Sequence, residues 1–128
     1  MPMALRILLW VGPLHVIGGI ALFLTAFLPQ AQNFLAMSLG LEGENYSPFL
    51  LAVLGPTIAS WGVLFTAVVR QFADYPTRRL WNALLIAVLV WAPLDTGLCL
   101  YYGVTGGVVV NSIVVVILLG LLFKVKAR

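Results

Sequence analysis

The chain has 128 residues, of which 62% are hydrophobic and only 9% are charged, and its mean hydropathy is +1.10. A soluble domain is usually about a quarter charged, and so small a chain cannot hide this much apolar surface from water. The composition therefore excludes a soluble globular protein and a disordered one, and the single cysteine excludes an internal disulfide framework.

Four stretches of the chain are apolar and long enough to cross a hydrocarbon core about 30 Å thick, which takes about 20 helical residues. They run over about 7–28, 49–69, 80–102 and 104–123. We predict an all-α fold in which a single domain, residues 1–128, forms an up-down bundle of four transmembrane helices. Gly103, between the last two stretches, and Gly106 and Gly107, just after it, favour a tight turn, because glycine tolerates positive φ.

Residues 29–48 form the connection between the first two stretches, and they mix apolar side chains with Glu42 and Glu44. Two interpretations of this outer loop stay open. One is a short helix that lies in the membrane interface, and the other is an ordinary loop whose apolar side chains reach into lipid.

The basic residues predict the orientation of the chain in the membrane. All seven lie before the first stretch, between the second and third, or after the fourth: Arg6, Arg70, Arg78, Arg79, Lys124, Lys126 and Arg128. The positive-inside rule places this side, and both termini, in the cytoplasm. The basic residues form no patch with interleaved aromatics, so we expect no nucleic-acid partner. The expected location is the plasma membrane, most simply the inner membrane of a bacterium.

Each of the first three stretches contains a proline that follows a small residue and precedes a polar one. These sites are Gly12-Pro13 before His15, Gly55-Pro56 before Thr57, and Ala92-Pro93 before Asp95. Proline removes a backbone donor, and in lipid the freed carbonyl needs another partner. Broken helices of this kind often line cavities. Proline is also simply commoner in membrane helices than in soluble ones, so both interpretations stay open.

Ionisable groups inside a membrane are costly and are candidates for function, and the predicted spans contain two of them, His15 and Asp95. Counting 1.5 Å per helical residue from the outer boundary places the polar residues in two layers. The shallower layer, roughly 10–12 Å deep, contains Asp95, Asn111 and Thr57, and the deeper one, roughly 17–20 Å, contains His15, Ser60 and Trp61. We take these six as candidate ligand-binding residues. The offset of about 10 Å between His15 and Asp95 exceeds hydrogen-bond reach unless a helix kinks.

Each candidate also has a structural interpretation. Asp95 could bind a cation, an amine or a proton, or its carboxyl could be bonded to Asn111 or to a proline-freed carbonyl. His15 lies on a stripe of small residues, so it could bind a ligand or belong to a packing face and bond a neighbour such as Ser60. Asn111 alone is typical of interhelical contacts, and Cys99 of a small apolar filler.

The residue inventory also limits the chemistry. One histidine and one cysteine cannot form a tetrahedral zinc site or a bis-histidine haem site, and there is no Cys-x-x-Cys motif. We predict no metal, no cofactor and no catalytic residues. The favoured function is binding or transport of a small cationic or amphipathic molecule, or a proton, in an outward-facing pocket, since Glu42, Glu44 and Asp95 make that side acidic. The alternatives are a non-catalytic subunit of a larger membrane complex and, third, an enzyme acting on a lipid-soluble substrate. The expected partners are the lipid bilayer and, as alternatives, a second copy of the chain in a homodimer or another protein of a membrane complex.

Overall fold

The computed structural model describes residues 1–40 and 48–126, and these residues form five helices. They are α1 (Met3–Thr25), α2 (Pro29–Leu39), α3 (Pro48–Asp74), α4 (Arg78–Tyr101) and α5 (Thr105–Lys124). Helices α1, α3, α4 and α5 are long and apolar enough to cross a membrane. This confirms the predicted all-α fold with four candidate spans. Glu42 and Glu44 lie outside the described residues.

The helices extend beyond the apolar stretches on the side of the basic residues. Helix α1 already includes Arg6, α3 continues through Arg70 to Asp74, and α4 begins at Arg78. Long basic side chains can lie along apolar surface with the charged group in water, so a helix does not have to end where the hydropathy falls.

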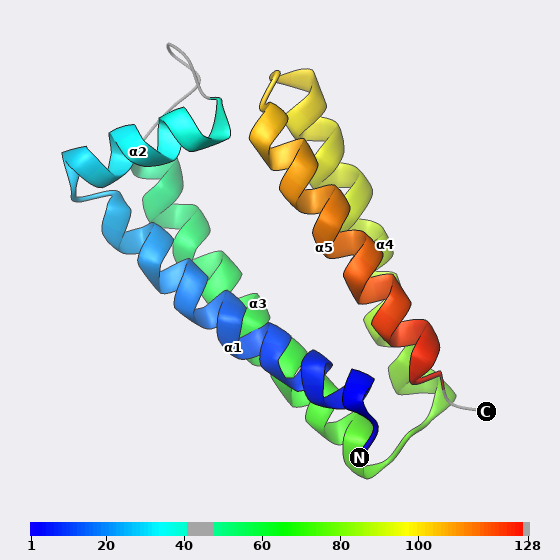
Figure 1. The fold of residues 1–128 in the computed structure, drawn as a ribbon. Helices are drawn as coiled ribbons and strands as arrows, with labels where there is room; N and C mark the ends of the chain where they lie inside the picture. The colour runs from blue at the N-terminus through cyan, green and yellow to red at the C-terminus, as the bar shows by residue number, and fades with distance from the viewer. Residues whose placement is uncertain (41–47, 127–128) are drawn as a thin grey trace.

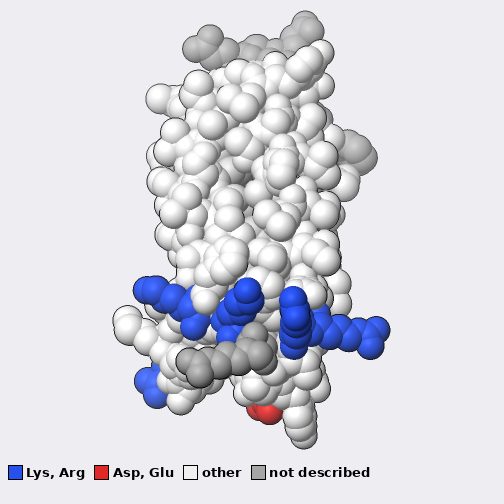
Figure 2. Space-filling model, turned by 90° about the vertical axis from the view of Figure 1, so that its right-hand side faces the viewer, with Lys and Arg blue, Asp and Glu red and all other residues white. Residues whose placement is uncertain are grey.

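The four long helices form two hairpins that lie side by side (Figure 1). Helix α1 packs mainly on α3, and α4 packs mainly on α5. The start of α1, the end of α5 and the connection 75–77 share one end of the molecule, which we call the basic end because the described Lys and Arg gather there (Figures 1 and 2). Helix α2 lies across the opposite end, which we call the α2 end. The two hairpins converge at the basic end and diverge toward the α2 end (Figure 1).

Glycines allow the backbones of α1 and α3 to touch. A side-chain carbon added at Gly62 would lie 2.6 Å from the carbonyl oxygen of Gly12, and one added at Gly55 would lie 2.5 Å from that of Gly19. In both helices the two glycines are seven residues apart, so the contact repeats every two turns. Small residues that admit close backbone approach are the usual basis of helix association in lipid, where the hydrophobic effect provides no drive.

The two hairpins share an apolar core at the basic end. Its members come from all four long helices: Leu5, Leu8, Phe65, Val69, Phe72, Trp81, Leu84, Val88, Leu118, Leu121 and Leu122. Within it, the Trp81 indole Nε1 donates to the carbonyl oxygen of Leu122 at 2.8 Å. Leu122 belongs to the last turn of α5, where carbonyls have no partner inside the helix, so Trp81 satisfies one of them. The Lys126 ammonium lies 5.2 Å from the Trp81 ring on the same side.

Residues Pro29–Leu39 of the predicted outer loop form helix α2 and are not an irregular loop. Pro29 starts the helix, where its missing N–H costs nothing, and Gly40 ends it with φ at 69°. The end of α2 rests on the start of α5, since a side-chain carbon at Gly106 would meet the Leu39 Cα at 2.9 Å. Phe34 and Met37 are 73% and 84% exposed, as expected for a helix whose apolar side chains face the membrane interface.

The turn between α4 and α5 has the tight form that its glycine predicted. Gly103 has φ at 70°, a conformation that other L residues adopt at a cost, and its N–H donates to the Leu100 carbonyl at 3.2 Å. The Val104 N–H donates to the Cys99 carbonyl at 2.8 Å and so satisfies a carbonyl in the last turn of α4. Helix α5 then follows as an antiparallel neighbour of α4.

Candidate functional site

A carboxylate and an amide from neighbouring helices meet in the half of the bundle nearer the α2 end. The Asn111 amide nitrogen on α5 donates to Asp95 Oδ2 on α4 at 2.5 Å. Asn111 is only 7% exposed, and Asp95 is half-buried. Depth counting assigned these two residues to one layer, and the structure brings them together.

The local sequence explains why α4 and α5 approach so closely here. Asp95 and Cys99 are four residues apart and share one face of α4, as Asn111 and Gly107 share one face of α5. In the antiparallel pair Cys99 lies opposite Gly107, where a side-chain carbon would fall 2.6 Å from the cysteine sulfur. The Asn111 amide nitrogen is also 3.9 Å from that sulfur. The missing side chain of Gly107 thus admits Cys99 and holds Asp95 within reach of Asn111.

No positively charged group belongs to the pair of Asp95 and Asn111. An asparagine amide is neutral, and the Lys and Arg in Figure 2 gather at the basic end, whereas Asp95 lies in the last third of α4, toward the α2 end. An ionised carboxylate in a medium of low dielectric is costly unless a cation or several hydrogen bonds compensate it. This is the feature of the site that most needs a functional or structural explanation.

His15 and Trp61 form a separate cluster between α1 and α3. Their ring centroids are 4.6 Å apart, and Trp61 in turn stacks on Phe65 at 4.8 Å. The His15 Nδ1 lies 2.7 Å from the Val11 carbonyl oxygen, and because a carbonyl only accepts, this nitrogen is the donor. The hydrogen bonds of the described residues connect His15 to its own helix, and none connects it to Asp95 or Ser60.

Thr57 and Ser60 do not join either cluster. Both side chains are exposed, and their hydroxyls donate to carbonyls of their own helix, Thr57 to Val53 at 3.0 Å and Ser60 to Thr57 at 2.9 Å. Hydroxyls in membrane helices commonly satisfy themselves in this way. Of the three polar residues that follow the prolines, only Asp95 is bonded to another helix.

The sequence interpretation assigned Cys99 a filling role only, although it contacts the Asn111 amide. The spacing of four residues between Asp95 and Cys99 already indicates that both lie on the same face of α4. Among residues 1–40 and 48–126, no three His, Cys, Asp or Glu side chains come close enough to hold a metal ion.

Comparison with known proteins finds no matching family model, no matching curated protein and no matching solved structure.

Proposed function

We propose that this small membrane protein binds a small cation, or a proton, at Asp95 and exchanges it with the solution at the α2 end of the bundle. The observation that supports the proposal is the bond from the neutral Asn111 amide to a carboxylate inside a candidate span. Asparagine alone would hold the helices together at lower cost than a carboxylate, so the acidic group implies a positive partner.

The chemistry of the pair favours a ligand that brings positive charge or hydrogen-bond donors. The Asn111 amide nitrogen directs one N–H at Asp95 and also lies 3.9 Å from the Cys99 sulfur, which leaves the Asn111 carbonyl oxygen and Asp95 Oδ1 as acceptors for a ligand. Trp91 lies one turn before Asp95 on the same face of α4, and an indole ring attracts cations. A proton, a protonated amine and an amphipathic organic cation all meet these conditions, whereas an anion does not.

A second function, a non-catalytic subunit of a larger membrane complex, is favoured by a different observation. The apolar core that joins the hairpins lies at the basic end, and the hairpins diverge toward the α2 end (Figure 1). A helix of another protein could pack on the apolar residues that stay exposed on the hairpins toward that end, such as Leu54 and Val109. In that case the bond between Asp95 and Asn111 would serve packing, as polar residues often do between membrane helices.

The proposal is tested by native mass spectrometry of the protein extracted gently from its own membrane. The variants are Asp95→Asn, which keeps the shape and a hydrogen-bonding partner for Asn111, and Asp74→Asn as the matched control. Asp74 is exposed at the end of α3, outside the bundle interior. We expect wild type and Asp74→Asn to retain a small cationic adduct, or to take up a lipophilic cation such as tetraphenylphosphonium, and Asp95→Asn to lose it.

The same experiment separates the two functions. Retention of the adduct in Asp95→Asn would contradict cation binding at this site. Co-migration with another polypeptide, with no adduct and no uptake of the probe cation, would instead favour the accessory subunit.

A further inference from the structure

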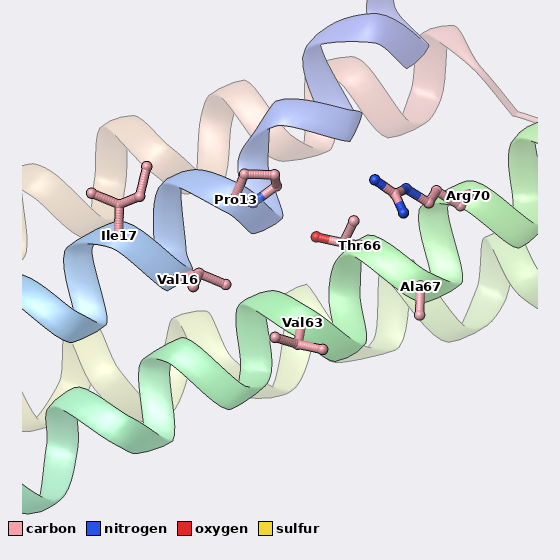
Figure 3. Close-up of a pocket in the computed structure, with 7 residues that line it drawn as sticks. All are labelled: Pro13, Val16, Ile17, Val63, Thr66, Ala67 and Arg70. Carbon is pink, nitrogen blue, oxygen red and sulfur yellow. The ribbon is translucent and has the colours of Figure 1, made fainter.

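The face of the α1–α3 hairpin that points away from α4 and α5 contains a groove of about 430 Å³ (Figure 3). Its apolar walls come from both helices: Pro13, Val16, Ile17, Val63 and Ala67. The groove forms because the compact side chains of Pro13 on α1 and Ala67 on α3 leave space between the two helices. Its volume falls in the range of small-molecule sites, about 300–1,000 Å³. Because it opens away from the second hairpin, it faces the hydrocarbon region.

One charged side chain lines this groove. Arg70 of α3 extends from the basic end toward Pro13, so that its guanidinium lies at the mouth of the apolar walls (Figure 3). Thr66 is the other polar lining residue, and its hydroxyl is already donated to the Gly62 carbonyl at 2.7 Å. Arg6 lies seven residues before Pro13, which is two turns along the same face of α1 toward the basic end. The groove therefore offers apolar contact along its length and positive charge at one end.

This arrangement matches one class of molecule that already surrounds the face. A phospholipid has an acyl chain that fills apolar grooves and a phosphate that a guanidinium binds with two parallel hydrogen bonds. Free phosphate would leave the apolar walls unfilled, and a lipid without net negative charge would leave the positive charge of Arg70 uncompensated. We propose that the groove is a binding site for an anionic phospholipid of the leaflet at the basic end, with its phosphate on Arg70 and an acyl chain along Pro13, Val63 and Ala67.

The site is independent of Asp95, which lies on the other hairpin, so its test does not depend on the proposed function. Detergent-purified protein is titrated with phosphatidylglycerol and with phosphatidylcholine of identical acyl chains, and the first bound lipid is measured by native mass spectrometry. Wild type is compared with Arg70→Gln, with Ala67→Phe and with the matched control Arg79→Gln. Ala67 and Arg79 are both exposed, so neither change disturbs a buried contact.

We expect wild type to prefer phosphatidylglycerol. A basic residue near the headgroups attracts an anionic lipid, so we expect Arg70→Gln to weaken phosphatidylglycerol binding about fivefold. Arg79→Gln should leave phosphatidylglycerol binding unchanged. Ala67→Phe fills the groove and should remove the first site for both lipids while circular dichroism shows the same helix content. The proposal is overturned if Arg79→Gln weakens binding as much as Arg70→Gln, if both lipids bind wild type equally, or if Ala67→Phe retains the lipid. A dimer of wild type that Ala67→Phe dissolves would assign the groove to a second copy and would also overturn it.

Discussion

The glycine contact between α1 and α3 makes a prediction that two adjacent residues can test. Gly18 and Gly19 lie in the same helix, but an added side-chain carbon has open space at Gly18, whereas at Gly19 it would lie 2.5 Å from the Ala59 nitrogen of α3. Ordinary contact begins near 3.4 Å, so Gly19→Ala requires the two backbones to separate by about 1 Å. A gap of that size removes about a quarter to a half of the dispersion attraction between atoms in contact.

The magnitudes decide the sign for each variant. Alanine gains about 0.5–1 kcal/mol over glycine within a helix, and overpacking a tight interface costs about 1–3 kcal/mol. Gly19→Ala should therefore lose up to about 2.5 kcal/mol of stability, whereas Gly18→Ala should gain up to about 1 kcal/mol. The assay is equilibrium unfolding of the purified protein by SDS in mixed micelles, followed by circular dichroism. Equal effects of the two substitutions would refute the backbone contact between α1 and α3.

Two further predictions concern buried hydrogen bonds. Trp81→Phe removes the donor to the Leu122 carbonyl and should cost about 1–3 kcal/mol in the same unfolding assay. Trp10→Phe, on the exposed face of α1, should change stability by less than about 0.5 kcal/mol. Similar losses in the two variants would show that the indole hydrogen bond does not stabilise the fold. Asn111→Leu leaves the Asp95 carboxyl without its hydrogen-bond partner and should cost about 1–3 kcal/mol of stability. Adding Asp95→Leu should restore most of that stability, because two apolar side chains then replace a hydrogen-bonded pair. A double variant that is less stable than Asn111→Leu would contradict this interpretation.

Much of the fold follows from the sequence because the bilayer fixes it. The length of a span is set by the hydrocarbon thickness, so the apolar runs identified all four long helices, and the need for positive φ identified the turn at Gly103. The ends of the helices were less predictable. Hydropathy falls at Arg70, but the helix continues to Asp74 because the peptide hydrogen bonds do not depend on the polarity of the side chain.

The site was predictable only in part, because a rise per residue gives depth but not direction. Depth counting placed Asp95 beside Asn111, and the structure joins them. It also placed Thr57 in that layer, although the Thr57 side chain is exposed and bonds its own helix. The direction of a side chain depends on how the helices are rotated about their axes, and that rotation comes from the register of glycines such as Gly19 and Gly55. The groove at Arg70 has no local pattern, because residues of two helices form it together.

Asp95 is proposed to lie in a site that cations reach from the α2 end, and Cys99 offers a direct test of this access. Cys99 is the only cysteine of the chain, lies one turn from Asp95 and is half-buried. Reconstituted protein is exposed from the α2 end to two membrane-impermeant methanethiosulfonate reagents of similar size, one a trimethylammonium cation and one a sulfonate anion. We expect the cation to modify Cys99 about tenfold faster than the anion, and Asp95→Asn to remove this preference. Modification at equal rates, or no modification of Cys99 from that end, would contradict it.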